Sequence, residues 1–200
     1  IDDFAKVFFG MNDGDWGQIT FELADVARDL GKVYPYDWKT FLDTRLNQPN
    51  QPAPVRGIEL GGYRLNWKEE PNPFDKARMA DAKSLSLTYS LGLTIDKDAR
   101  VTATQWDSPA FNAGLVTGTK ILAINGTAYS ADDMKRAITA AKTGAPLELL
   151  VQRGDRFQTV KLDYKGGLRW PWVERAAPGT GPVGLDLLLL PRRAQGGKAK

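Results

Sequence analysis

Few side chains in this sequence could act in catalysis. The 200 residues include no histidine and no cysteine. This excludes Ser-His-Asp and Cys-His catalysis, disulfides, and zinc sites built on imidazole or thiolate. Of the acidic pairs, Asp132-Asp133 is explained by the positive dipole at a helix N-terminus, which favours acidic residues, and Glu69-Glu70 matches a solvated surface. The glycine pairs do not follow a phosphate-loop pattern. We therefore predict no catalytic residue, no metal site and no cofactor in this chain.

One short stretch, Ser90-Leu91-Gly92-Leu93, is unusual for its backbone. It lies between two runs in which apolar and polar residues alternate, 85–89 and 93–95. Alternation with a period of two is typical of a half-buried strand. A glycine between two such runs marks a position where the backbone must be free of a side chain. The stretch is therefore predicted to be a loop between two strands.

The run at 108–126 has a series of local signals. Ser108 and Pro109 predict the start of a short helix. A buried strand is predicted at 121–124, and the Asn125-Gly126 turn closes it.

A longer helix and a hairpin follow. Ser130 with Asp133 resembles a capping box and predicts a helix that runs to Lys142. The apolar face of this helix consists of Met134, Ala137, Ile138 and Ala141. Further strands are predicted at 99–106, 147–153 and 157–164.

The loop at 90–93 and the run at 108–126, in this order, resemble a PDZ domain in the variant typical of bacterial proteases. The resemblance implies an α+β fold in which residues 83–165 form a partly open barrel or sandwich of five to six strands with two helices. A PDZ groove offers backbone amides to a terminal carboxylate, an exposed strand edge to the peptide, and an apolar pocket to its last side chain.

The resemblance assigns each part of the groove. The loop would supply the amides, Gly92 would let the peptide backbone approach, and residues 93–95 would be the free strand edge. The predicted peptide-binding residues are Ser90, Leu91, Gly92, Leu93, Thr94, Ile95, Met134 and Ile138. Without a helix histidine, a preference for serine or threonine near the ligand end is not expected, so an apolar C-terminus is the predicted ligand. The alternative is a structural PDZ domain, because leucine and isoleucine here are also ordinary core residues.

Residues 1–48 predict three short helices with one-sided apolar stripes. Thr20 is the expected N-cap of the second helix and Gly31 its end, and Asp37 begins the third. Such helices must pack on each other or on a larger body to bury their apolar faces. We interpret the segment as the end of a catalytic region, or as a self-sufficient cap on the following domain.

Residues 49–82 predict a Pro-rich linker and a connecting strand. The strand is indicated by the alternation of Tyr63, Leu65 and Trp67. Its expected partner is an arm that contains Ile58 and Leu60.

Residues 166–200 predict a C-terminal extension. Its aromatic and leucine runs are expected to pack back on the body. A further hypothesis is that the leucine run at 185–190 folds into the groove and blocks it.

Composition sets limits on location and partners. Four basic residues fall within the last ten positions, and removing them from the net charge of +3 leaves −1. A basic tail without interleaved aromatics does not predict nucleic-acid binding. No apolar run approaches the roughly 18 residues of a membrane span. The start at Ile1-Asp2 indicates a fragment or a processed product, so the lack of a signal peptide does not locate the parent protein. Between the bacterial periplasm and the cytoplasm, we favour the periplasm.

Beyond the PDZ segment, residues 1 to about 190 resemble the C-terminal part of the glycyl aminopeptidase family, zinc metallopeptidases that end in a PDZ domain. The residues that carry this resemblance are Asp2-Asp3-Phe4-Ala5, Phe8-Phe9-Gly10, Tyr36-Asp37-Trp38, Phe41-Leu42, Gly61-Gly62-Tyr63-Arg64-Leu65, Tyr89-Ser90-Leu91-Gly92-Leu93, Trp106-Asp107-Ser108-Pro109-Ala110-Phe111, Tyr164 and Gly167-Leu168. The family implies a gluzincin-like catalytic domain, in which a water bound to zinc by an HExxH helix attacks the peptide bond.

This chain departs from the family pattern because it has no histidine and therefore no HExxH. No catalytic residue can be carried over, so the zinc and the catalytic domain are expected upstream in the parent protein. We predict a non-catalytic C-terminal part of a metallo-aminopeptidase, whose PDZ domain binds peptide C-termini or substrate by strand addition. Its expected partners are peptide or protein C-termini and the upstream catalytic domain. A PDZ domain of a heat-shock serine protease is disfavoured, because those proteases join it to β-barrels and residues 1–46 are helical.

Overall fold

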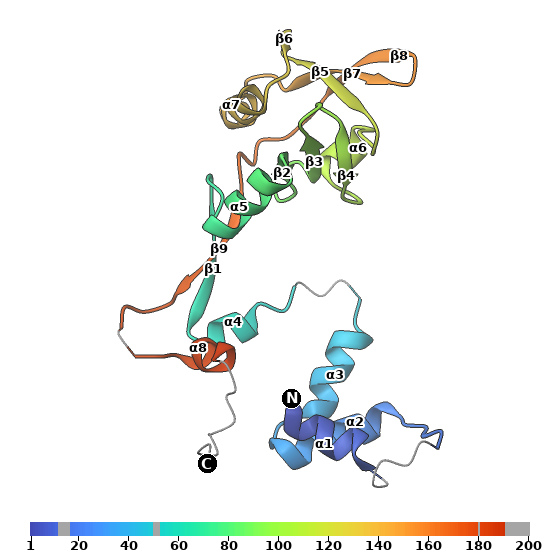
Figure 1. The fold of residues 1–200 in the computed structure, drawn as a ribbon, viewed down its shortest axis with the longest axis vertical. Helices are drawn as coiled ribbons and strands as arrows, with labels where there is room; N and C mark the ends of the chain where they lie inside the picture. The colour runs from blue at the N-terminus through green and yellow to red at the C-terminus, as the bar shows by residue number, and fades with distance from the viewer. Residues whose placement is uncertain (12–16, 50–52, 180, 191–200) are drawn as a thin grey trace, which may run out of the picture. The chain divides into compact units, whose positions relative to one another are not determined.

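The computed structural model describes residues 1–11, 17–49, 53–179 and 181–190 (Figure 1). The chain divides into two compact units, residues 1–54 and 55–200. The first unit contains the helices α1 (Asp2–Phe9), α2 (Leu23–Val33) and α3 (Trp38–Leu46). Its packing is aromatic: the buried Phe8 ring lies 5.0–5.2 Å from the rings of Phe4, Phe9 and Phe21. The predicted three-helix segment is confirmed.

The bounds of the second helix differ from the prediction. Glu22, not Thr20, is its N-cap, and the Glu22 N–H donates to Asp25 Oδ2 at 2.9 Å. The helix also continues through Gly31. A helical glycine costs only about 1 kcal/mol, and the N–H of Tyr34 still reaches the carbonyl of Leu30. Asp37 begins the third helix as predicted, since its carboxylate accepts from the Thr40 N–H at 3.1 Å.

A strand near the start of the second unit pairs with a strand near its end to form a two-stranded ribbon. It is formed by β1 (Tyr63–Lys68) and β9 (Trp170–Arg175), which pair antiparallel. The helices α4 (Arg56–Leu60) and α8 (Gly184–Leu189) lie near one end of this ribbon (Figure 1). The predicted strand at Tyr63 is confirmed, but its expected partner arm is wrong. Ile58 and Leu60 lie in the helix α4. The strand that pairs with β1 comes instead from a segment far along the chain.

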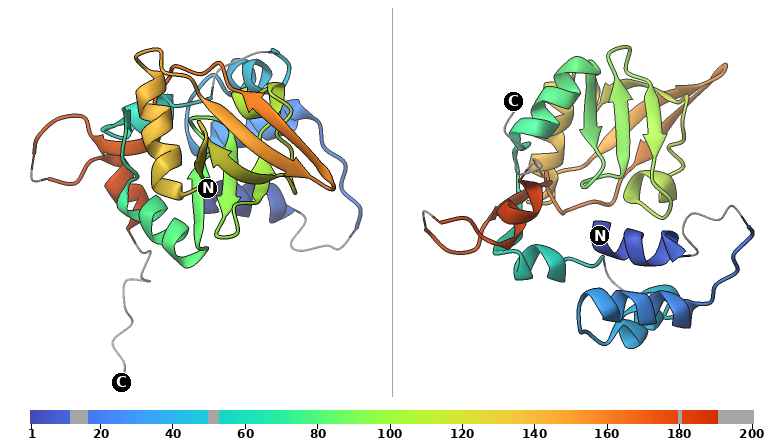
Figure 2. Two further views of the ribbon diagram at one scale, coloured as in Figure 1. Left: turned by 90° about the horizontal axis from the view of Figure 1, so that it is seen from above. Right: turned by 60° about the horizontal axis from the view of Figure 1, so that its bottom comes forward.

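The rest of the second unit is the two-sheet domain, here meaning β2 to β8 with α6 and α7. One sheet has the order β2-β3-β4 and the other β6-β5-β7-β8 (Figure 2). The strands are β2 (Ser84–Leu87), β3 (Leu93–Asp96), β4 (Val101–Thr104), β5 (Lys120–Ile124), β6 (Thr127–Ala128), β7 (Glu148–Arg153) and β8 (Arg156–Lys161). The helices are α6 (Pro109–Asn112) and α7 (Ala131–Ala141), and α5 (Pro73–Asp81) precedes the domain. Two open sheets with helices confirm the predicted α+β class.

Local signals place the two helices of this domain. The Ser108 hydroxyl accepts from the Phe111 N–H at 3.2 Å, and the Ser130 hydroxyl accepts from the Asp133 N–H at 3.0 Å. Each bond satisfies a donor that a helix N-terminus leaves free. All four residues predicted for the apolar face of α7 are buried. One cluster of buried side chains joins both sheets and α7.

The C-terminal segment packs on this core only in part. Leu168 and Trp170 belong to the buried cluster, which confirms the prediction for the first part of the aromatic run, whereas Val173 is 48% exposed. The leucine run does not pack on the core as predicted, because Leu187, Leu188, Leu189 and Leu190 are 55–75% exposed. No helix in the described part of the chain is long and apolar enough to cross a membrane.

Candidate functional site

The loop at 88–92 is fixed from two sides. The Leu91 carbonyl accepts from the Ala110 N–H of α6 at 2.9 Å. The Ser90 hydroxyl, almost fully buried, accepts from the Arg169 N–H at 3.0 Å. The loop is therefore held between α6 and the segment that leads to β9, in one conformation.

Gly92 serves this packing. Its φ is +79°, in the left-handed region that favours glycine. A Cβ at this position would lie 2.1 Å from the Cβ of Ser108, the N-cap of α6. The reason predicted from the sequence for this glycine is access for a ligand backbone. The close approach of Ser108 already requires a glycine here without any ligand.

Strand β3 has no free edge. It pairs with β4 on one side and with β2 on the other, in the register Leu87↔Leu93 to Ser84↔Asp96 (Figure 2). The prediction that residues 93–95 present an open edge is therefore wrong. The segment that occupies it runs antiparallel to β3 with its C-terminal end at the loop. A peptide adding its C-terminus at the loop would have the same direction.

The amides of the loop are occupied as well. The N–H groups of Ser90 and Gly92 both donate to the Leu87 carbonyl, at 3.0 and 2.9 Å. Two backbone amides that converge on one oxygen favour an oxygen with partial or full negative charge. In this structure they hold a peptide carbonyl, at the place where the sequence predicted a terminal carboxylate.

The structure brings the predicted pocket residues together, but around side chains of the same chain. Leu91, Leu93, Ile95, Met134 and Ile138 are all buried in one cluster. That cluster also contains Leu85 and Leu87 of β2, which are 6% and 1% exposed. Thr94, by contrast, is half-buried, and its carbonyl accepts from the Thr102 hydroxyl at 3.3 Å.

Sequence reasoning missed the role of Leu85 and Leu87. Their alternation predicted a strand correctly, but nothing in the pattern says which strand it will join. The hypothesis that the leucine run at 185–190 fills the groove is also wrong. The groove is filled by β2, while the N–H of Leu185 donates to the Gly61 carbonyl beside β1.

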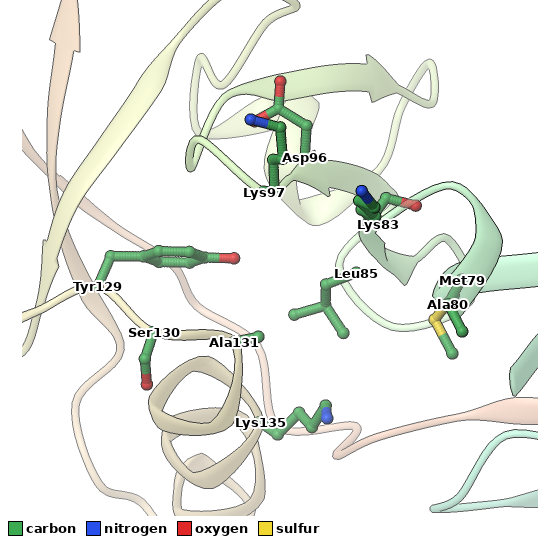
Figure 3. Close-up of a pocket in the computed structure, with 11 residues that line it drawn as sticks. Met79, Ala80, Lys83, Leu85, Asp96, Lys97, Tyr129, Ser130, Ala131 and Lys135 are labelled. Carbon is green, nitrogen blue, oxygen red and sulfur yellow. The ribbon is translucent and has the colours of Figure 1, made fainter.

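A pocket of about 460 Å³ lies between β2, α5 and the start of α7 (Figure 3). It is lined by the end of α5, residues 83–85, the end of β3 and residues 129–135. Burial, with a smaller effect from the Asp96 charge, raises the pKa of Tyr129 to about 12. Its phenol is therefore a hydrogen-bond donor at any physiological pH.

The chain matches no protein-family model and no curated protein. Similar solved structures do exist. One is the crystal structure of an aminopeptidase N family protein from Idiomarina loihiensis, with 17% identity and a TM-score of 0.49. That match covers 76% of this chain and 26% of the other, so this chain spans about a quarter of that protein's length.

Another similar structure is the HtrA3 PDZ domain bound to a phage-derived ligand, FGRWV. It has 16% identity and a TM-score of 0.28, and the match covers 56% of this chain and 94% of the other. The similar structures thus include an aminopeptidase N family protein and a PDZ domain. Both TM-scores are below 0.5.

Within the described ranges, no group of three or more histidine, cysteine, aspartate or glutamate side chains could hold a metal ion.

Proposed function

We propose that this chain is the non-catalytic C-terminal part of a longer peptidase of the aminopeptidase type. Its two-sheet domain, a PDZ domain by sequence resemblance, would serve in that protein as a packing module. Support for the peptidase comes from the family resemblance along residues 1 to about 190. Because this chain has no HExxH, the zinc and the catalytic residues of such a protein would lie upstream of it.

The packing role is carried by one observation: β2 lies on β3 with its last carbonyl on the loop amides. Burying a leucine stabilises a protein by roughly 1.5–3 kcal/mol, and β2 buries Leu85 and Leu87. A free peptide would have to replace both contacts. It would also lose translational and rotational freedom, which costs roughly 4–15 kcal/mol. A strand tethered by a short loop avoids most of that entropy loss, so β2 outcompetes a peptide of similar sequence.

A second candidate function is the binding of chain ends after β2 withdraws. The observation that favours it is that the amides of Ser90 and Gly92 already bind an oxygen. The predicted ligand is then a peptide with a free apolar C-terminus, and β2 acts as its internal competitor.

A disulfide between β2 and β3 separates these functions. Ser86 and Thr94 lie opposite each other, and the Ser86 N–H points away from β3, because it donates to Met79 Sδ. Such non-hydrogen-bonded pairs have Cα atoms about 4.5 Å apart, within the range for a disulfide. The double variant Ser86→Cys/Thr94→Cys introduces the only cysteines of the chain, so its oxidation is easy to interpret.

The matched control is Ser86→Cys/Thr104→Cys. Thr104 lies on β4, beyond β3, so its Cα is about 9–10 Å from that of Ser86. Both variants are oxidised, and binding of the peptide Lys-Ser-Leu-Ser-Leu, with a free or an amidated C-terminus, is followed by NMR at the loop amides of Ser90 and Gly92.

We expect the bridge to form in the first variant and not in the control. The packing function predicts no peptide-induced shifts of the loop amides in wild-type or bridged protein. The second function predicts that the free-acid peptide shifts the loop amides of wild type, does not shift those of the bridged form, and shifts them again after reduction. Failure of the bridge to form, or equal shifts of the loop amides in the bridged form, would contradict the groove described above.

A further inference from the structure

We propose that the pocket between β2, α5 and the start of α7 binds a small apolar carboxylate, such as an acylated amino acid or the last residue of a peptide. This site is distinct from the groove at the loop, and it is available while β2 fills that groove. The volume of about 460 Å³ falls in the range of about 300–1,000 Å³ for ligand pockets.

The floor of the pocket is apolar. Leu85 contributes the face that it does not bury in the core, and Met79 and Ala80 of α5 continue this surface (Figure 3). Ala131 completes the floor from α7. Methionine adapts readily to ligands of different shape. An aliphatic side chain of one residue would replace water over this floor.

Three lysines, Lys83, Lys97 and Lys135, stand around the floor (Figure 3). With Asp96 as the acid of the lining, three positive charges and one negative leave +2. Asp96 is engaged elsewhere, because its Oδ1 accepts from the N–H groups of Asp98 and Arg100 at 2.9 and 2.8 Å.

These lysines are available to a ligand. Lys83 forms no ion pair in the described part of the chain. The pairs Lys97–Asp98 and Lys135–Asp132 both measure 3.2 Å and are exposed to solvent. Exposed pairs contribute only about 0–1 kcal/mol, so a carboxylate can recruit either lysine at little loss.

The hydroxyl of Tyr129 would orient a carboxylate bound in the pocket. Figure 3 shows its hydroxyl pointing into the space between Leu85 and the lysines. No residue in the described ranges accepts a hydrogen bond from it. A half-buried phenol that stays protonated is an unused donor, and a carboxylate oxygen is the acceptor that best matches it.

The outer edge of β2 adds a place for a backbone. Because the Ser86 N–H points away from β3, the backbone groups of Ser84 point the same way by alternation, and Ser84 lines the pocket. Lys83, just before it, has φ +47°, a conformation that costs a side-chain-bearing residue roughly 1–2 kcal/mol. The chain thus holds a lysine at the rim in an unfavourable backbone conformation.

The test is an NMR titration of the full chain, and of its bridged Ser86→Cys/Thr94→Cys form, with N-acetyl-leucine and with N-acetyl-leucinamide. The bridge keeps β2 on β3, so binding to the bridged form cannot come from the groove. We expect saturable shifts at Leu85, Tyr129 and Lys135 in both forms. The amide should bind about tenfold more weakly or not at all. Ala-Ala-Ala-Leu as a second ligand distinguishes the sources: tighter binding than N-acetyl-leucine points to a chain end, and equal binding to a free acid.

Variants complete the test. Lys83→Gln and Lys135→Gln should each weaken binding about two- to fivefold, and Tyr129→Phe about tenfold. Tyr129→Phe should leave the melting temperature unchanged, because its hydroxyl makes no bond in the described structure. Lys76→Gln, on α5 but outside the pocket, is the control for net charge. The proposal is overturned if acid and amide bind alike, if the shifts map elsewhere, or if the three variants bind as Lys76→Gln does.

Discussion

Replacement of Gly92 by alanine should destabilise the second unit by two separate effects. An alanine at φ +79° costs about 1–2 kcal/mol. Its Cβ would also lie 2.1 Å from the Cβ and 2.5 Å from the Oγ of Ser108, whereas carbon atoms in contact are about 3.5–4.0 Å apart. Relieving this overlap by shifting the loop or α6 costs about 1–3 kcal/mol. The sum is a loss of about 2–5 kcal/mol.

Two further variants separate these effects. Gly114 has the same φ of +79°, but nothing lies within 4 Å of a Cβ there. Gly114→Ala should therefore show the backbone effect alone, about 1–2 kcal/mol. In the double variant Gly92→Ala/Ser108→Gly the overlap is absent, and a serine N-cap replaced by glycine loses only about a few tenths of a kcal/mol. The double variant should be more stable than Gly92→Ala.

The assay is native-state amide exchange on buried strand residues such as Ile95 and Ile121. These amides report the unfolding free energy of the second unit without interference from the helices of the first. If Gly92→Ala loses no more stability than Gly114→Ala, contact with Ser108 is not the reason for this glycine. Its predicted role in admitting a ligand backbone would then return.

Two other substitutions test the packing of β2 and of α8. Leu87→Ala removes a side chain that is 1% exposed and should cost about 2–5 kcal/mol. Leu150→Ala, at 39% exposure, should cost roughly 1 kcal/mol or less. Both variants are measured by urea titration, and equal losses would show that β2 is not part of the core. For α8, hydrogen bonds from the Tyr63 hydroxyl and the Val183 N–H, together with the Arg175 charge, lower the pKa of Asp186. Since the pKa is lower in the folded state, this stabilisation is complete above about pH 4 and is lost as pH falls through the folded-state value. Exchange protection of α8 should fall over that range. In Asp186→Asn it should be weak and independent of pH, and an unchanged acid transition in that variant would contradict the assignment.

Much of the local structure could be predicted because its causes are local. The side chains of Ser108, Ser130 and Asp37 each accept a hydrogen bond from the backbone N–H three residues later. The sequence signal and the contact therefore lie in the same short stretch. The buried face of α7 follows from helical periodicity for the same reason. The second helix shows the limit: Thr20 has the preferred residue type for an N-cap, but the helix begins after Glu22, whose N–H donates to Asp25.

Strand pairing could not be predicted in this way. Tyr63, Leu65 and Trp67 identify β1, but their partners on β9 are recognised only when the chain returns after the whole two-sheet domain. A strand pattern specifies which side chains are buried, and it leaves the identity of the neighbouring strand open.

The sequence by itself determined that this chain has no histidine for an HExxH site, that a loop around Gly92 lies between two strands, and that Met134 and Ile138 face a core. Only the tertiary structure decided what fills that core beside β3. The alternation at Leu85 and Leu87 is equally consistent with a strand next to an open groove and with a strand that fills the groove. The choice depends on the direction in which the chain folds back at the loop, and on the Leu87 carbonyl reaching the amides of Ser90 and Gly92. These are contacts between backbone groups, and backbone groups are the same in every residue, so no side-chain pattern records them.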